Sequence, residues 1–178
     1  MELLDEAIDT TKHKYPVKYP ILNMANEIEK EYSNLSKKYK LPKFKAIDDE
    51  FEISSLDNEK FLIKNILRSI SEKLEFYIEF ISNLVHPDGS SISSMYEIRS
   101  FSEDEKNGMY TLFKRLMKID RNIVEIILRN DEKEQADFLN KFFSDWLDTK
   151  KELLKYIKKM KDSWEKQSTI EEDIGYFG

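Results

Sequence analysis

Residues that break helices are confined to a few positions in this 178-residue chain. It contains four prolines and four glycines, and no proline falls inside the long stretches in which apolar residues recur every three or four positions, although Pro20 opens the first of them. Of the glycines, only Gly108 falls inside such a stretch. Because proline and glycine both disfavour helix interiors, this placement predicts long uninterrupted helices with joints marked by Pro16, Pro20, Pro42 and Pro87.

Four stretches have the period of an amphipathic helix. They cover residues 20–39, 57–85, 102–129 and 131–166, and each has apolar residues on one face and charged residues on the other. Helices of this kind bury their apolar faces against one another. The sequence therefore predicts an all-α fold, a four-helix bundle of near-parallel long amphipathic helices with a long first connector, a short extra helix near residue 95 and mobile termini.

Local signals mark where two of these helices begin. Ser102 and Glu105 have the spacing of a capping box, and Asp131 is a suitable N-cap with Glu134 three residues later. A polar segment around Thr149 interrupts the last stretch, but the apolar phase continues through it. We therefore expect one continuous last helix.

The pattern divides the chain into three parts. Residues 1–19 are expected to form a loosely attached N-terminal arm, and residues 20–166 the bundle domain. Residues 167–178 have no helical period and combine acidic with aromatic residues. They are expected to form a flexible C-terminal tail.

The charge and the first residues limit the location and the partners of the chain. With 29 basic and 35 acidic residues, the formal net charge of -6 does not favour nucleic acid or an anionic membrane surface. The first residues are acidic, unlike a secretory signal, and no apolar run approaches the ~20 residues needed to cross a bilayer. We expect a cytoplasmic protein that does not bind membranes.

The sequence offers little material for catalysis or for cofactors. Cysteine is absent, and neither of the two histidines has a glutamate three residues before it, as di-iron bundles require. No glycine-rich phosphate loop is present. The acidic cluster Asp48, Asp49, Glu50 and Glu52 lacks the order of a calcium loop and is interpreted as solvated charge. We therefore predict no catalytic, metal-binding or cofactor-binding residues.

A lysine ridge is predicted on the last helix. It consists of Lys151, Lys155, Lys158 and Lys159, whose helical spacing could follow a row of phosphates. The same lysines also suit the C-terminal half of a solvated helix, where cations meet the macrodipole favourably. Nucleic-acid binding through this ridge is the alternative function.

The C-terminal tail has the composition of a docking peptide, with anchors at Ile170, Ile174, Tyr176 and Phe177. Its opening, Gln167-Ser168-Thr169-Ile170, resembles the sliding-clamp-binding box, in which a glutamine and an aliphatic residue precede two aromatic residues. The aromatic pair of this chain, Tyr176-Phe177, comes three residues later than in that box. The resemblance implies a peptide that inserts its aromatic pair into a hydrophobic pocket.

The order of the predicted helices is similar to the bromodomain layout, which also has a long first connector and an asparagine, here Asn130, just before the last helix. The resemblance implies a bundle that binds a peptide carrying acetyl-lysine. This connector lacks the usual proline and aromatic pattern of that family, and Arg129 stands where the family has tyrosine. A bromodomain-like, peptide-binding bundle is the third hypothesis.

The leading hypothesis is a non-catalytic protein-protein binding or assembly module with an unknown protein partner. Homo-oligomers are also considered, because Tyr32 and Tyr39 lie on a narrow apolar seam of the first helix that could extend beyond the core of one chain.

Overall fold

The computed structural model describes residues 19–57, 60–86 and 91–165, and the regular elements within these ranges are all helical. This confirms the all-α prediction. The predicted arm and tail fall outside the described residues, apart from Tyr19, which begins the first helix. The helices are α1 (Tyr19–Tyr39), α2 (Phe44–Phe51), the 3-10 helix η1 (Ile53–Ser55), α3 (Leu62–Val85), α4 (Ile92–Arg99), α5 (Glu103–Arg129) and α6 (Glu132–Glu165).

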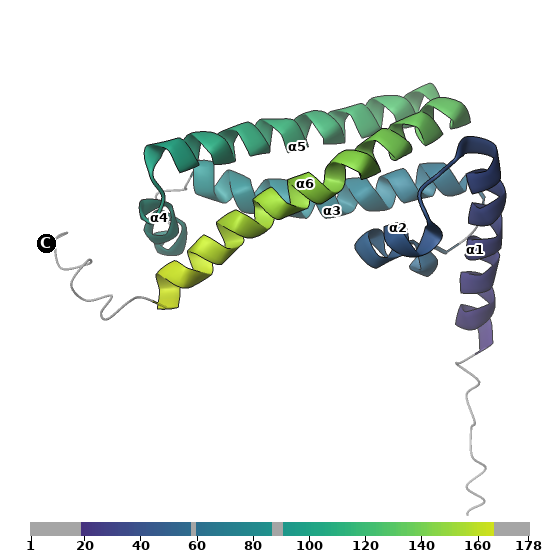
Figure 1. The fold of residues 1–178 in the computed structure, drawn as a ribbon, viewed down its shortest axis with the longest axis horizontal. Coiled ribbons are helices and arrows are strands. Elements are labelled where there is room, and N and C mark those ends of the chain that lie inside the picture. Colours follow the sequence, from purple (N-terminus) through teal and green to yellow (C-terminus); the bar gives the residue numbers. More distant parts are fainter. Residues whose placement is uncertain (1–18, 58–59, 87–90, 166–178) are drawn as a thin grey trace, which may run out of the picture.

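Three of the long helices, α3, α5 and α6, run along the molecule, and α1 lies across one end of them (Figure 1). The chain reverses direction between α3 and α5 and again between α5 and α6. This arrangement differs from the four near-parallel helices predicted. The reason lies in the first connector, which folds into α2 and η1 and packs between α1 and α3. Its residues Ile47, Phe51 and Ile53 are buried, so α1 rests on the connector instead of lying along the bundle.

The core of the bundle lies between α3 and α5, the pair of helices with the most extensive contact. Full burial of an aliphatic side chain contributes about 1.5–3 kcal/mol, so this interface supplies a large share of the stability. The fully buried residues of these two helices include Ile63, Ile66, Leu67, Ile70, Leu74 and Ile81 of α3 with Met109, Leu112, Leu116 and Ile123 of α5.

Several helix ends follow the predicted signals. The capping box is present, because the Ser102 hydroxyl accepts from the Glu105 amide and the Glu105 carboxylate accepts from the Ser102 amide. Asp131 accepts from the amide of Glu134 at 2.8 Å. Helix α6 is continuous through Thr149, whose hydroxyl donates to the carbonyl of Asp145 at 3.1 Å.

One predicted start was wrong. Helix α3 begins at Leu62 and not at residue 57, because Phe61 adopts a left-handed backbone conformation with φ 53° that cannot continue a helix. The short extra helix predicted near residue 95 is α4, which begins at Ile92 because Ser91 accepts a hydrogen bond from the Ser94 amide and acts as the N-cap. Left-handed residues also occur at Lys40, Glu52 and Asn130, directly after α1, α2 and α5.

Gly108 explains why a glycine is present inside the long helix α5. A Cβ atom at this position would lie 2.5 Å from the hydroxyl of Tyr156 on α6. Tyr156 is buried, so its ring has little room to move. The absent side chain therefore allows α6 to pack closely on the first turns of α5.

The two tyrosines considered for self-association contact other parts of the same chain. Tyr32 is buried, and its hydroxyl donates to the carbonyl of Pro42 at 2.8 Å. Burial raises its pKa well above the usual value. The Tyr39 hydroxyl donates to the carboxylate of Glu132 on α6 at 2.7 Å. Both side chains thus fix α1 and the connector to the rest of the molecule.

Candidate functional site

A groove of about 260 Å³ lies between α5 and α6. Its lining is mostly apolar, and the apolar part on α6 comes from three aromatic residues spaced four residues apart, Phe138, Phe142 and Trp146. Phe142 and Trp146 are 4% and 3% exposed, so only a small part of each ring faces the groove. The first two rings stack with centroids 6.3 Å apart and the last two with centroids 5.7 Å apart. We call these three residues the aromatic ladder. Ile119 of α5 completes the apolar lining.

Positively charged residues surround this groove. Arg115 and Lys118 on α5 and Lys141 on α6 line it, together with Asp145. Arg115 is bound to Glu152, whereas Lys118 and Lys141 are exposed and have no ion-pair partner among the described residues. The groove therefore combines an apolar lining with a net positive charge, which the Asp145 carboxylate offsets in part, although the whole chain has a net charge of -6.

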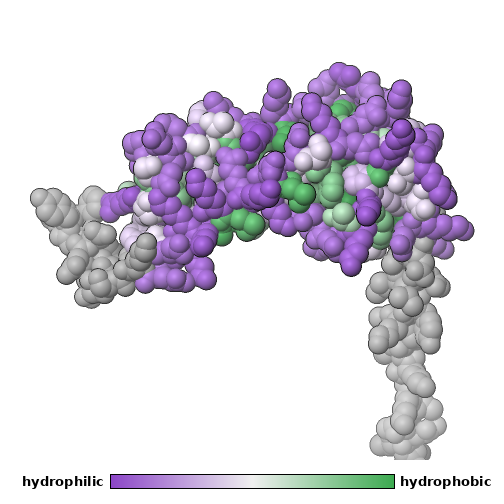
Figure 2. All heavy atoms as spheres, viewed as in Figure 1, coloured by the Kyte–Doolittle hydropathy of each residue, from purple (hydrophilic) through white to green (hydrophobic). Residues whose placement is uncertain are grey.

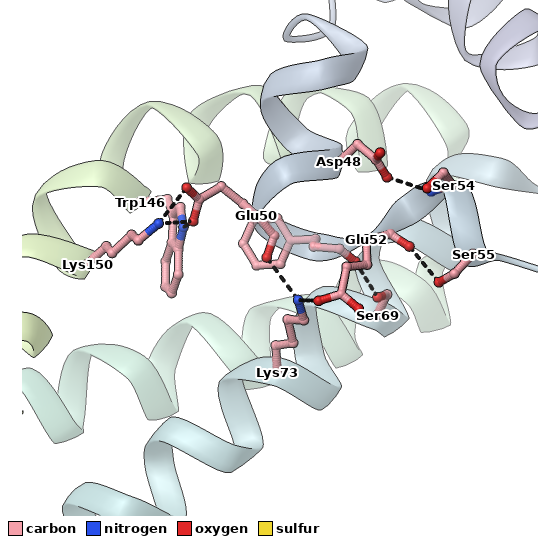
Figure 3. A network of polar contacts seen from close by, with 10 residues as sticks. Asp48, Glu50, Glu52, Ser54, Ser55, Ser69, Lys73, Trp146 and Lys150 are labelled. Carbon is pink, nitrogen blue, oxygen red and sulfur yellow. Dashed lines mark hydrogen bonds and ion pairs between the residues drawn. The ribbon is translucent and has the colours of Figure 1, made fainter. Parts of the chain in front are cut away.

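The last ring of the ladder is held by a polar network from the connector (Figure 3). The indole Nε1 of Trp146 donates to the Glu50 carboxylate at 2.8 Å, and Lys150 donates to both oxygens of the same carboxylate. On the other side, the ammonium of Lys73 donates to the Glu50 carbonyl and forms an ion pair with Glu52. This network joins α2, α3 and α6.

Glu50 was predicted to be solvated, and this interpretation was wrong. Its side chain is only 16% exposed in its ion pair with Lys150. Burial by itself raises the pKa of Glu50, but the hydrogen bonds from Lys150 and Trp146 outweigh burial and hold this pKa below its usual value. Asp48 of the same cluster accepts from the Ser54 amide at 2.7 Å and stabilises the turn into η1. At least half of the cluster therefore has a structural role.

The predicted lysine ridge does not form a uniform row of free cations. Lys151 is paired with Asp148 at 2.9 Å, and Lys159 is bound to Glu105 and lies over the ring of Phe101. The bond from Lys159, followed by the Ser102 amide, lowers the pKa of Glu105 to about 2. Lys155 and Lys158 remain exposed.

Three of the four ridge lysines share one shallow hollow on the surface. The hollow is lined by Lys155, Lys158 and Lys159 with Asp162, Ser163 and Ser100, and Lys151 is not among these residues. The carboxylate of Asp162 offsets part of the positive charge. The structure therefore brings together a smaller basic cluster than the sequence suggested.

Other predicted features have different positions. The apolar period of the last helical stretch predicts Ile157 and Trp164 on the core face of α6, but they are 39% and 40% exposed, and Thr149 and Tyr156 are buried on that face. Leu147 and Leu154 are also exposed on α6. In Figure 2 the visible face is mostly hydrophilic, and hydrophobic residues reach it in patches through the middle of the molecule. The docking residues Ile170, Ile174, Tyr176 and Phe177 lie outside the described residues.

The described residues contain no group of three or more His, Asp or Glu side chains that could hold a metal ion. In the same part of the chain, no helix has both the length and the apolar character needed to cross a membrane. His86 lies at the C-terminal end of α3, where its ring makes edge contacts with Tyr110 and Phe113.

Sequence reasoning missed the groove, although its residues carried a signal. The apolar period of α6 predicts Phe142 and Trp146 in the core, which is confirmed by their burial, and Phe138 precedes them by one more helical turn. A row of large aromatic residues at this spacing can cover the core and still present ring edges to a neighbouring groove. Lys118 and Lys141 come from different helices, so only the packing of α5 on α6 brings them together.

Comparison with known proteins finds no protein-family model, no curated protein and no solved structure that matches this chain.

Proposed function

We propose that this chain is a non-catalytic protein-binding module whose α5–α6 groove receives an acidic segment with apolar side chains from a partner protein. The observation that carries the proposal is the placement of two unpaired lysines, Lys118 and Lys141, beside the aromatic ladder. Aromatic side chains are frequent anchors of binding energy, and a charged rim selects and steers a partner of opposite charge.

The support of Trp146 favours a preformed site. Its indole is fixed by Glu50, and its ring stacks on Phe142. Side chains that are already ordered lose less conformational entropy when a partner binds. The groove is small, so a short helical turn or a few extended residues fit it better than a large folded surface.

The test uses peptides selected from a displayed random library for binding to the full chain. Affinities are measured by isothermal titration calorimetry. A rim variant, Lys118→Glu with Lys141→Glu, is compared with a control variant, Lys37→Glu with Lys133→Glu, which makes the same charge change at exposed residues that do not line the groove. We expect acidic, aromatic peptides whose affinity falls by about tenfold or more in the rim variant only. Equal losses in both variants would refute the groove as the site.

Nucleic-acid binding is the second candidate function. It is favoured by the hollow that gathers Lys155, Lys158 and Lys159, and it is opposed by the ion pairs of Lys151 and Lys159. Phosphate recognition would give binding that weakens steeply with salt, which separates it from binding through an apolar groove.

The bromodomain-like hypothesis has the least support. Asn130 is exposed at the turn between α5 and α6, and its side-chain oxygen accepts from Lys64 at 3.1 Å. An acetyl-lysine site needs an asparagine amide inside an apolar pocket. The Asn130 amide is exposed and has no such enclosure.

A further inference from the structure

The chain contains a segment whose chemistry matches the groove. Residues 170–177 read Ile-Glu-Glu-Asp-Ile-Gly-Tyr-Phe, with three consecutive acidic residues between apolar ones and an aromatic pair at the end. The groove offers the complementary pattern, with Arg115 and Lys118 at one end and the aromatic ladder beyond them.

We propose that residues 170–177 occupy the α5–α6 groove of the same chain, so that an external partner must displace them. This inference rests on the proposed function of the groove and names the segment that competes for it. The occupant runs back along α6 in the opposite direction, with its acidic residues beside Arg115 and Lys118 and its aromatic pair on the ladder.

The length of chain after α6 is sufficient for this path. From Glu165 back to Thr149, at the near end of the groove, the helix rises by about 24 Å at ~1.5 Å per residue. An extended chain spans up to about 3.4 Å per residue, so residue 173 can reach about 27 Å from Glu165. Phe177 can reach about 41 Å on the same basis, and Phe142 lies about 35 Å along the helix.

These reaches place the two halves of the segment at different parts of the groove. When fully extended, Glu171 reaches about 20 Å from Glu165, which is level with Glu152, the partner of Arg115. Asp173 reaches about 27 Å, beyond Thr149, but Lys141 lies about 36 Å along α6 and stays out of reach. Tyr176 and Phe177 reach Trp146 and Phe142 only in a nearly extended conformation. Lys141 therefore remains available to an acidic partner, which gives that partner an advantage in displacing the segment.

A paramagnetic label tests the position of the segment in the full chain. Because the chain has no cysteine, Gly175→Cys provides a unique attachment point for a nitroxide. We expect amide signals of residues 115–122 and 138–149 to lose intensity relative to the reduced, diamagnetic sample. The loss should disappear in the rim variant Lys118→Glu with Lys141→Glu and persist in the control variant Lys37→Glu with Lys133→Glu.

The contradicting outcomes are specific. Intensity loss around Lys155 and Lys158 in place of the groove would assign the segment to the lysine hollow and overturn the inference. Loss that survives in the rim variant would do the same. A mixed sample separates docking within one chain from docking between two copies. It combines nitroxide-labelled chain that carries no isotope with isotope-labelled chain that carries no nitroxide. Loss of signal in this mixture would show docking between copies and overturn the intramolecular arrangement.

A competition experiment separates this inference from the proposed function. A peptide selected from the display library is titrated into the full chain and into a variant carrying Tyr176→Ser and Phe177→Ser. If the segment occupies the groove, the variant binds the peptide about tenfold more tightly, because a tethered competitor acts at an effective concentration near the millimolar range. If the full chain and the Tyr176→Ser, Phe177→Ser variant bind the peptide equally well, and the rim variant weakens this binding, the inference is wrong and the proposed function stands. If the rim variant does not weaken peptide binding, the proposed function is wrong.

Discussion

Ser71 on α3 donates its hydroxyl to the carboxylate of Asp120 on α5, inside the interface that forms the core of the bundle. Asp120 is 2% exposed and also accepts from Arg121 at 3.0 Å. In a row of apolar contacts, several offsets of one helix against another are similar in energy. A single polar pair is satisfied at only one of them, so this contact fixes the register of α3 on α5.

The first prediction concerns this pair. Asp120→Ala leaves the half-buried Ser71 hydroxyl without its acceptor and should lower the free energy of unfolding by about 1–3 kcal/mol. Asp120→Asn retains an acceptor for Ser71 and should cost less. Urea unfolding of both variants checks the order, and an alanine variant as stable as the asparagine variant would contradict it.

The second prediction concerns the contact of Gly108 with Tyr156. Gly108→Ala improves helix propensity by about 1 kcal/mol but places a methyl group against the Tyr156 hydroxyl. We expect the alanine to destabilise the protein when Tyr156 is present. In a Tyr156→Phe background the obstructing oxygen is absent, so the same alanine should be neutral or stabilising. Thermal unfolding of the four proteins gives the coupling, and additive effects would show that the hydroxyl is not the obstacle.

The third prediction concerns acid. The ammonium of Lys159 lowers the pKa of Glu105 to about 2, from a usual value of 4.5. A carboxyl group with a lowered pKa in the folded state contributes stability above its unfolded pKa and loses that contribution as the pH falls toward its folded pKa. The free energy of unfolding should therefore decline between about pH 4.5 and 2.

Its control is Glu105→Gln, which cannot titrate. The slope of stability against pH over this window should be smaller in the variant, as followed by urea unfolding at several pH values. Glu50 and Glu132 also have lowered pKa values, so part of the slope should remain. An unchanged slope would show that Glu105 does not titrate with folding.

The fourth prediction concerns the lysine hollow. Lys155→Gln with Lys158→Gln removes the two exposed cations without touching the ion pairs of Lys151 and Lys159. If the chain binds single-stranded nucleic acid through the hollow, the variant should bind more weakly, and the slope of log affinity against log salt should fall by about 1–2. Fluorescence anisotropy at several salt concentrations measures both, and an unchanged slope excludes the hollow as the phosphate contact.

Sequence patterns predicted the helical elements well where the signal is local. The capping box at Ser102, the N-cap at Asp131 and the continuity of α6 at Thr149 depend on neighbours within one or two turns, and all three are present. The start of α3 could not be predicted, because phenylalanine rarely adopts the left-handed conformation that Phe61 has, so its residue type does not indicate a helix boundary.

Long-range features were harder to predict for a physical reason. On α6 the apolar period alone favours Ile157 for the core, but Tyr156 is buried in its place, beside the space that Gly108 leaves on another helix. The same applies to the groove, since Lys118 and Lys141 line one site only when α5 packs on α6. The position of α1 depends on the buried connector, whose scattered apolar residues show no period.

The left-handed residues at the helix ends have a practical consequence. Lys40, Glu52, Phe61 and Asn130 all adopt a backbone conformation that glycine would occupy without steric cost. Apart from Asn130, whose side chain tolerates this conformation, each of them stores strain. Glycine at Lys40 or Phe61 could thus raise the melting temperature without changing the core or the groove, which makes the joints the natural starting points for engineering a more robust form of this protein.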